Sequence, residues 1–273
     1  MLRSASLFLI LLGLNSFCGV ARADTQFTGD AEQTGPMSKR VYAVNDHGWL
    51  RLPSNHRDLT LESLAVGTAA KLFVPADIRS LRVNHLTLSH KAIVSIAPRY
   101  EEFVLTVQRA DFADGSMIVA TGENGDLGVP GGHGTDLRLT LASGRIANLT
   151  LDTRGGDGGR GWPGEAGQNG RDATCWGRGT SRGQSGGQGG DGQPGGDGGN
   201  ITLKLADPQW LEVIDVRQYG GQGGLAGEAG AAGKGGDPAS CWLYSLGRDA
   251  RGGHAGSPGK ASSAGRQGIL RVQ

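Results

Sequence analysis

The sequence is poor in cysteine and aromatic residues, and it has no long hydrophobic run after its first segment. Three cysteines occur in 273 residues, and aromatic residues make up 5% of the chain. This composition excludes a disulfide-dense scaffold, and no later stretch approaches the ~20 apolar residues of a membrane-spanning helix. Lys and Arg number 27 against 26 Asp and Glu. The balance leaves no basic footprint for nucleic acid or for an anionic membrane.

The first residues predict export. Arg3 precedes the apolar run Leu7–Leu14, and Ala21-Arg22-Ala23 places small residues where a signal peptidase cleaves. Residues 1–23 are therefore predicted to be a signal peptide. The mature chain is then secreted, periplasmic or displayed at the cell surface, and it retains two cysteines, Cys175 and Cys241. In an exported protein, two cysteines predict one disulfide bond.

The segment that follows is predicted to be rich in β-strands, because helical periodicity is nearly absent. Residues 24–45 show no clear pattern and are expected to form a loose N-terminal arm. Residues 46–151 are expected to form a β-rich base, since short apolar runs alternate there with polar residues and tight turns. Strands continue further along the chain, where eight apolar side chains are expected to stack in one core: Leu149, Leu151, Ile201, Leu203, Val213, Val216, Ile269 and Leu270.

Glycine is abundant, with 50 residues, and most of them lie in five runs where glycine recurs at every third position. The runs are run 1 (122–134), run 2 (155–170), run 3 (183–198), run 4 (221–236) and run 5 (253–268). The recurrent glycine is the first position of each triplet, and Ser262 replaces it once in run 5. A flexible linker has no reason to keep such a period. The runs are therefore predicted to be ordered.

A period of three places the glycines along one side of a left-handed extended helix with three residues per turn. Collagen uses this period, and "GWPGEAGQNG" and "GSPGKA" resemble bacterial collagen-like repeats. The longer runs span only ~16 residues, roughly 50 Å in this conformation. Such short runs favour helices that pack within one chain, and a trimeric collagen-like stalk is the alternative.

The C-terminal part, residues 152–273, is predicted to be an internal duplication. In each copy a strand leads to a glycine run, a loop with a cysteine, a second glycine run and another strand. The loops contain Asp172-Ala-Thr-Cys175-Trp176 and Asp237-Pro-Ala-Ser-Cys241-Trp242. Each pair of runs must leave one strand and return to the next. The two runs of a pair are therefore expected to be antiparallel neighbours, with both loops at one end.

The triplet runs, the antiparallel returns and the cystine-tied turns resemble the polyglycine-II bundles of the snow-flea type of antifreeze protein and of some phage tail-tip adhesins. The resemblance covers roughly residues 120 to 270 and implies that hydrogen bonds between helices replace an apolar core. The expected fold is mainly β, with a small β-solenoid-like base, a bundle of left-handed polyglycine-II helices and almost no α-helix outside the signal peptide. A β-sandwich base is the alternative.

A calcium site is only weakly indicated. "GGQGGD", residues 186–191, matches the start of a calcium-binding nonapeptide repeat. The pattern then fails, because Gln193 stands where a buried apolar residue is needed. Asp191 and Asp197 are the weak calcium candidates, and the favoured interpretation places them at solvent-facing third positions. The histidines show no metal-ligand spacing, and no other cofactor is expected.

The sequence favours an exported, non-catalytic binding or structural protein: an adhesin, a matrix component or an envelope component. Aromatic residues on exposed loops are the candidate contacts for a cell-surface or matrix glycan or protein: Trp162, Trp176, Trp242 and Tyr244. The other interpretation is that these rings cover the disulfide and cap the bundle end. A monomer without a membrane span is expected. A carbohydrate-active enzyme on a β-solenoid is the alternative function, although no catalytic motif is present.

Overall fold

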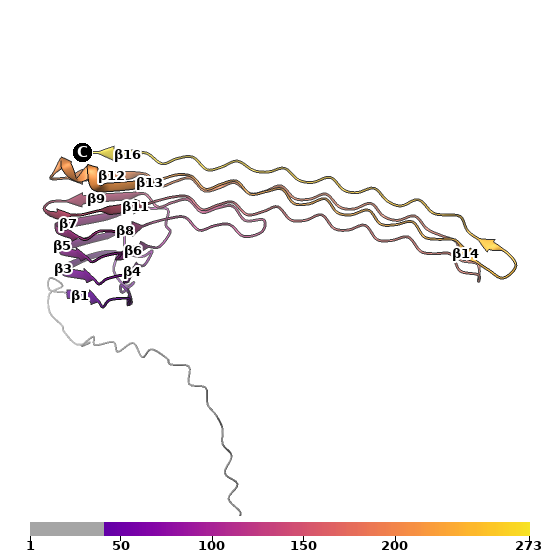
Figure 1. The fold of residues 1–273 in the computed structure, drawn as a ribbon, viewed down its shortest axis with the longest axis horizontal. Coiled ribbons are helices and arrows are strands. Elements are labelled where there is room, and N and C mark those ends of the chain that lie inside the picture. The colour runs from indigo at the N-terminus through magenta and orange to yellow at the C-terminus, as the bar shows by residue number, and fades with distance from the viewer. Residues whose placement is uncertain (1–40) are drawn as a thin grey trace, which may run out of the picture. The chain divides into compact units, whose positions relative to one another are not determined.

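The computed structural model describes residues 41–273, which belong to one compact unit that begins at Met37. The predicted signal peptide and most of the predicted arm lie outside the described residues. The strands stack at one end of this unit, and the glycine runs extend away from them side by side (Figure 1). Residues 41–44 already form a strand, so the β-rich region begins before residue 46.

The described residues are mainly β, and almost all of the strands lie in two parallel sheets. The larger sheet has the order β1-β3-β5-β7-β9-β12-β16, with β10 pairing to β7, and the smaller has the order β13-β11-β8-β6-β4-β2. The larger sheet consists of β1 (Val41–Val44), β3 (Asp58–Val66), β5 (Ser80–Leu88), β7 (Phe103–Phe112), β9 (Leu137–Leu141), β10 (Gly144–Ile146), β12 (Ile201–Leu205) and β16 (Leu270–Val272). The smaller sheet consists of β2 (Trp49–Arg51), β4 (Lys71–Val74), β6 (Ile93–Ile96), β8 (Ser116–Val119), β11 (Leu149–Asp152) and β13 (Ile214–Arg217).

The register between strands shows how the chain stacks. Val41 of β1 pairs with Ser63 of β3, and Ser63 pairs in turn with His85 of β5. Successive strands of the larger sheet are therefore 22 residues apart in this region. The chain enters the smaller sheet between visits to the larger one, so each circuit adds one strand to each sheet. This winding explains why neighbours in both sheets are parallel.

The core lies between the inward faces of the strands. In β5 the side chains of Leu81, Val83, Leu86 and Leu88 are buried, and most of the residues between them are partly or fully exposed. Within Leu81–Val83 and Leu86–Leu88 this alternation follows the period of two of a strand with one buried face, and the two exposed residues Asn84 and His85 interrupt it. As expected from the sequence, Leu149, Leu151, Ile201 and Leu203 are fully buried. The stack of strands is thus held together by an ordinary apolar core.

Two expectations about the last strands are wrong. Ile269 and Leu270 are 55% and 38% exposed, because β16 is the terminal strand of its sheet and has a neighbour on one side only. Residues 208–213 form a 3₁₀-helix, η1 (Pro208–Val213), so Val213, which was expected in a strand of the core, lies in this helix and is half-buried. Asp207 caps this helix by accepting a hydrogen bond from the backbone N–H of Gln209.

The glycine runs leave the sheets at the same corner of each circuit. Run 1 connects β8 to β9, runs 2 and 3 connect β11 to β12, and runs 4 and 5 connect β13 to β16. Strand β11 pairs parallel to β13, and β12 pairs parallel to β16. Run 2 therefore starts beside run 4, and run 3 ends beside run 5, at the spacing that the sheets impose.

Hydrogen bonds between backbones hold runs 2–5 together. In all four runs each first-position N–H donates to a carbonyl of another run or of its immediate flank. Run 2 donates to run 4 from Gly155 to Tyr219 and onward in steps of three, and run 3 donates in the same way to run 5. Run 4 donates to run 3 and run 5 donates to run 4, both with antiparallel register. The predicted antiparallel pairing of the two runs within each copy is confirmed.

Run 1 differs from the others because it reverses in the middle. The N–H of Val129 donates to the carbonyl of Asp126, and the N–H of Gly132 donates to the carbonyl of Glu123. The outgoing arm donates to run 2, and the returning arm donates to run 3. Run 1 is thus a short hairpin that lies on the first part of the longer runs.

Run 3 is the most enclosed of the runs, and its second positions include Gly187, Gly190, Gly196 and Gly199. It bonds to runs 2, 4 and 5 and, near the sheets, also to run 1. Run 5 bonds only to runs 3 and 4 and lies at the edge. Gly189 in run 3 is buried, and a Cβ atom there would overlap the carbonyl oxygen of Gly227. The glycines on the facing sides are what allow this close backbone approach.

We expect Gly189→Ala to lower the free energy of unfolding by more than about 2 kcal/mol, because the added methyl group separates runs 3 and 4 and weakens several hydrogen bonds of ~1 kcal/mol each. Gly179→Ala is the matched control, since its new Cβ meets nothing within 4 Å. Thermal or denaturant unfolding measures the difference. Equal effects of the two substitutions would contradict this account of the packing.

Candidate functional site

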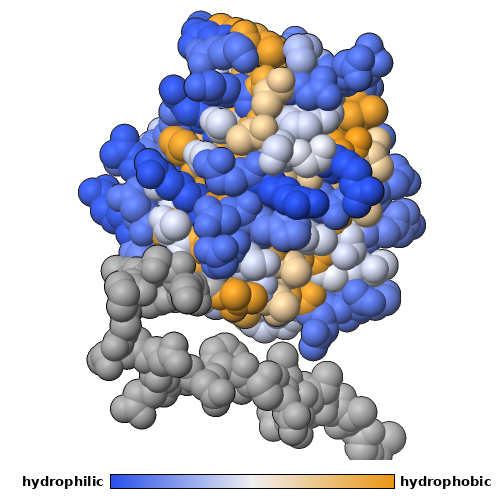
Figure 2. Space-filling view, turned by 90° about the vertical axis from the view of Figure 1, so that its left-hand side faces the viewer, coloured by the Kyte–Doolittle hydropathy of each residue, from blue (hydrophilic) through white to orange (hydrophobic). Residues whose placement is uncertain are grey.

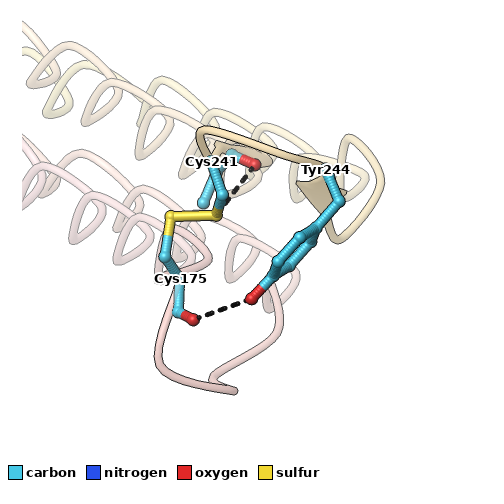
Figure 3. The surroundings of a disulfide bond; sticks show 4 residues. Cys175, Cys241 and Tyr244 are labelled. Atoms are coloured by element: carbon cyan, nitrogen blue, oxygen red, sulfur yellow. Dashed lines mark hydrogen bonds between the residues drawn. A yellow bond between two sulfur atoms is a disulfide. The ribbon is translucent and has the colours of Figure 1, made fainter.

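The candidate site is the tip of the bundle, where the loops of both copies meet. The first loop joins runs 2 and 3, and the second, which joins runs 4 and 5, contains the two-stranded hairpin of β14 (Ala239–Ser240) and β15 (Ser245–Leu246). A disulfide bond joins Cys175 to Cys241, with their Cα atoms 5.8 Å apart (Figure 3). The predicted pairing within one chain is confirmed, and both loops lie at one end as expected.

Further hydrogen bonds tie the two loops. The phenol of Tyr244 donates to the carbonyl of Cys175 at 3.2 Å (Figure 3). The N–H of Ala173 donates to the carbonyl of Asp237 at 2.9 Å, and the hydroxyl of Thr180 donates to the carbonyl of Arg248 at 2.9 Å. The loops are therefore fixed to each other by the disulfide and by contacts on both sides of it.

Each loop ends in a tight turn whose apex carries tryptophan. In the first turn the N–H of Gly177 donates to the carbonyl of Thr174, and Gly177 has a φ of 94°, which favours glycine. Trp176 stands directly before that glycine. In the second turn the N–H of Cys241 donates to the carbonyl of Tyr244 at 2.8 Å, which leaves Trp242 and Leu243 as the two central residues.

The apex side chains are almost completely open to solvent. Trp176 is 96% exposed, Trp242 is 95% exposed and Leu243 is 78% exposed, while Tyr244 is 54% exposed. Since each tryptophan directly follows a cysteine of the disulfide, the bond brings both rings to the same end of the bundle. In contrast, the opposite end of the described unit is mostly hydrophilic, with its apolar residues in small scattered groups (Figure 2). The tip is thus an exposed apolar feature of the kind that marks an interaction site.

Trp162 does not belong to this group. It lies in run 2, and its indole ring contacts Gly128 at the turn of the run 1 hairpin, where a Cβ atom would overlap the ring. The ring is 61% exposed, but its position is set by this contact. The interpretation that the rings cover the disulfide holds for neither Trp176 nor Trp242, because both are almost fully exposed.

Asp191 and Asp197 take part in the packing of the bundle. The carboxylate of Asp191 accepts a hydrogen bond from the N–H of Lys260, and that of Asp197 accepts one from the N–H of Arg266, both at 2.7 Å. They belong to a ladder of third-position side chains that accept from the N–H of the neighbouring run. The other pairs are Asn124 with Asp157, Asp157 with Gln222, Asn169 with Lys234, Asp172 with Asp237, Ser185 with His254 and Asn200 with Ile269.

This ladder was not predicted from the sequence; Asp191 and Asp197 were expected to face solvent, and Asp191 is indeed exposed while its carboxylate accepts from the neighbouring run. The sequence nevertheless contains a pattern that indicates this ladder. Asn, Asp or Ser recurs at third positions of the accepting runs, each of which comes earlier in the chain than the run that donates to it. The Oδ atom of Asp or Asn and the Oγ atom of Ser lie close enough to the backbone to accept from an adjacent N–H. Among the described residues, no group of three or more His, Cys, Asp or Glu side chains is arranged to hold a metal ion.

A polar groove of about 480 Å³ lies where runs 1, 2 and 4 leave the smaller sheet. Its polar lining includes Thr121, Asn124, Arg154, Asp157, Tyr219 and Gln222. Arg154 forms two hydrogen bonds of 2.9 Å to the buried carboxylate of Asp152. The hydrogen bond and the charge of Asp152 raise the pKa of Arg154, so its guanidinium remains charged. This ion pair anchors the start of run 2 to the end of β11.

Reduction of the disulfide is expected to lower the free energy of unfolding by up to about 4 kcal/mol, because the bond closes a separation of 66 residues. Denaturant unfolding with and without reductant measures this, with the Cys175→Ser/Cys241→Ser variant as the second test. Unchanged stability in both tests would mean that the loops stay together without the bond.

The structural role of Asp191 predicts different results for two substitutions. Asp191→Asn keeps an oxygen that accepts from Lys260, as Asn169 does for Lys234, and should leave the melting temperature nearly unchanged. Asp191→Ala loses the acceptor and should cost about 1 kcal/mol. A calcium site would give a different result. Calcium would then raise the melting temperature of the parent chain, chelation would abolish this rise, and both variants would lack it.

The chain was compared with protein-family models, curated proteins and solved structures, and nothing matches it. No helix of residues 41–273 is both long enough and apolar enough to cross a membrane. The function must therefore be argued from the geometry of the tip and of the bundle that carries it.

Proposed function

We propose that the chain is an exported, non-catalytic binding or structural protein whose glycine-rich arm presents an aromatic tip to a cell surface or an extracellular matrix. The observation that carries the proposal is the exposure of Trp176 and Trp242, at 96% and 95%, directly beside the disulfide that joins their loops. Large aromatic side chains supply much of the binding energy at interfaces. Their complete exposure on a fixed scaffold is best accounted for by a partner.

We further infer that the runs are left-handed polyglycine-II helices and that the sheets form a β-solenoid. Two observations support this: the N–H bond at every third residue of runs 2–5, and the 22-residue offset between the paired strands β1, β3 and β5. Helices of this type have three residues per turn and no internal hydrogen bonds, so their backbone groups are available to neighbours. The arm then gains rigidity from bonds between runs, which keeps the tip away from the strands.

A single chain is sufficient to form this bundle. In collagen the glycine N–H groups bond between chains, whereas those at the first positions of runs 2–5 donate within one chain. This favours a monomer over the trimeric collagen-like stalk. An adhesin, a matrix component and an envelope component all fit a monomeric arm with a binding tip.

A carbohydrate-active enzyme is less well supported. Glycoside hydrolysis generally needs two carboxylates that flank the scissile bond. In the polar groove, Asp157 is the one carboxylate among its lining residues, and it already accepts a hydrogen bond from the N–H of Gln222. The groove therefore provides no pair with which to nominate a reaction.

The test is a binding screen against intact cells, cell-wall and capsular polysaccharides and matrix proteins, with reducing ends assayed in parallel. We expect binding without new reducing ends, and at least about a ten-fold loss of affinity in the Trp176→Ala/Trp242→Ala variant. Trp49→Ala is the matched control, because Trp49 is also exposed, at 68%, but lies in β2 of the smaller sheet. New reducing ends, or equal binding by both variants, would contradict the proposal.

A further inference from the structure

We propose that the tip binds the surface of an anionic phospholipid bilayer, with the apex side chains at the boundary between headgroups and acyl chains. This inference rests on the proposed function, because it names the partner of the same tip. Its starting point is the composition of the apex. Trp176, Trp242 and Tyr244 are amphipathic aromatic residues of the kind that concentrate at membrane interfaces. Leu243, 78% exposed between Trp242 and Tyr244, is purely apolar and offers a sugar or a polar protein surface no hydrogen bond.

Positive charge surrounds this apolar apex. The two loops and their junctions with the runs contain five arginines against three aspartates: Arg171, Arg178, Arg182, Arg248 and Arg251 against Asp172, Asp237 and Asp249. All eight residues are exposed. None of the five arginines forms a salt bridge within the described part of the chain, although eight salt bridges occur there. The near-neutral total charge therefore hides a local excess of positive charge at the tip.

An open groove at the tip offers donors for a phosphate group. Its volume is about 350 Å³, and it is lined by Gly170, Arg171, Asp172, Thr174, Arg178 and Gly179. Arg171 and Arg178 contribute two guanidinium groups, which recognise phosphate oxygens through paired N–H donors. The carboxylate of Asp172 is engaged by the N–H of Asp237 at 2.8 Å, which reduces its competition for the arginines.

The geometry favours a bilayer over a partner with a concave pocket of its own. The apolar residues occupy the convex apexes of two turns, and the arginines lie behind them along the loops. When such a tip inserts from water, its leading apolar residues pass the headgroups and reach the acyl boundary, and the basic residues behind them stay at the level of the anionic headgroups. Because the disulfide and the Tyr244 hydrogen bond fix the loops, little ordering is needed on binding.

The experiment measures binding of the full mature chain to vesicles. Phosphatidylcholine vesicles with phosphatidylglycerol are compared with vesicles of phosphatidylcholine alone, by co-sedimentation and tryptophan fluorescence. We expect at least about ten-fold tighter binding to the anionic vesicles, since each arginine near such a surface contributes about five-fold. The preference should shrink as salt rises, because the screening length is about 10 Å at 0.1 M. Dissolved inorganic phosphate at the concentration of the lipid headgroups should not displace the protein, which separates a bilayer from a free phosphate as the ligand.

Three variants distinguish the outcomes. Trp176→Ala/Trp242→Ala and Arg171→Gln/Arg178→Gln should each weaken vesicle binding about ten-fold or more, and Trp49→Ala should not change it. Unfolding curves of all three establish that the bundle is intact. Absence of vesicle binding, or vesicle binding that the tip variants leave unchanged, overturns the inference. In that case the binding screen described above decides the proposed function. If Trp176→Ala/Trp242→Ala loses binding to a glycan, to a protein or to a second copy of the chain, the proposed function stands with that partner. If it loses nothing, both proposals fail.

Discussion

The structure depends on hydrogen bonds between backbones that only glycine allows to come so close. The first-position N–H groups of runs 2–5 all donate outside their own run, and at this density of glycine the runs have few apolar side chains to bury. Each run therefore requires neighbours at a separation set by N–H to carbonyl bonds. In run 3 these neighbours are runs 2, 4 and 5, and a Cβ at Gly189 would overlap a carbonyl oxygen. In this part of the molecule, hydrogen bonds between closely packed glycine backbones therefore provide the stability that an apolar core provides elsewhere.

The sheets solve the problem of bringing such runs together. Loop closure costs entropy. The two arms of run 1 and runs 2–5 would have no preferred register if their ends were not fixed in space. Here β11 pairs with β13 and β12 pairs with β16, so the starts of runs 2 and 4 lie side by side, and so do the ends of runs 3 and 5. The apolar core between the strands fixes this spacing, and the ladder of Asp, Asn and Ser oxygens repeats it along the arm. The disulfide then holds the far end, which neither of the two parallel sheets reaches.

Much of this organisation follows from patterns in the sequence, and the exceptions have physical causes. The period of three predicts ordered runs, and the duplicated Cys-Trp loops predict the disulfide and its place at one end, because each pattern is repeated. The reversal in run 1 was not predicted, since Gly122 to Gly134 keep the same phase through the turn at Asp126–Val129. The exposure of Ile269 and Leu270 depends on their place at the sheet edge, which no local pattern reveals. Trp162 could not be separated from Trp176 and Trp242, because only the fold shows that it contacts Gly128.

The most direct test of the central claim is amide hydrogen exchange along run 3, measured residue by residue on the monomeric mature protein. The account predicts strong protection at the first positions, Gly186, Gly189, Gly192 and Gly195, whose N–H groups donate to run 5. It also predicts rapid exchange at the third positions Gln188 and Asp191, whose N–H groups have no such partner among the described residues. Protection at first and second positions with rapid exchange at these third positions would establish the bundle, because second-position N–H groups such as that of Gly190 donate to run 2. Uniform rapid exchange across residues 183–198, or protection that appears only in a trimer, would contradict it.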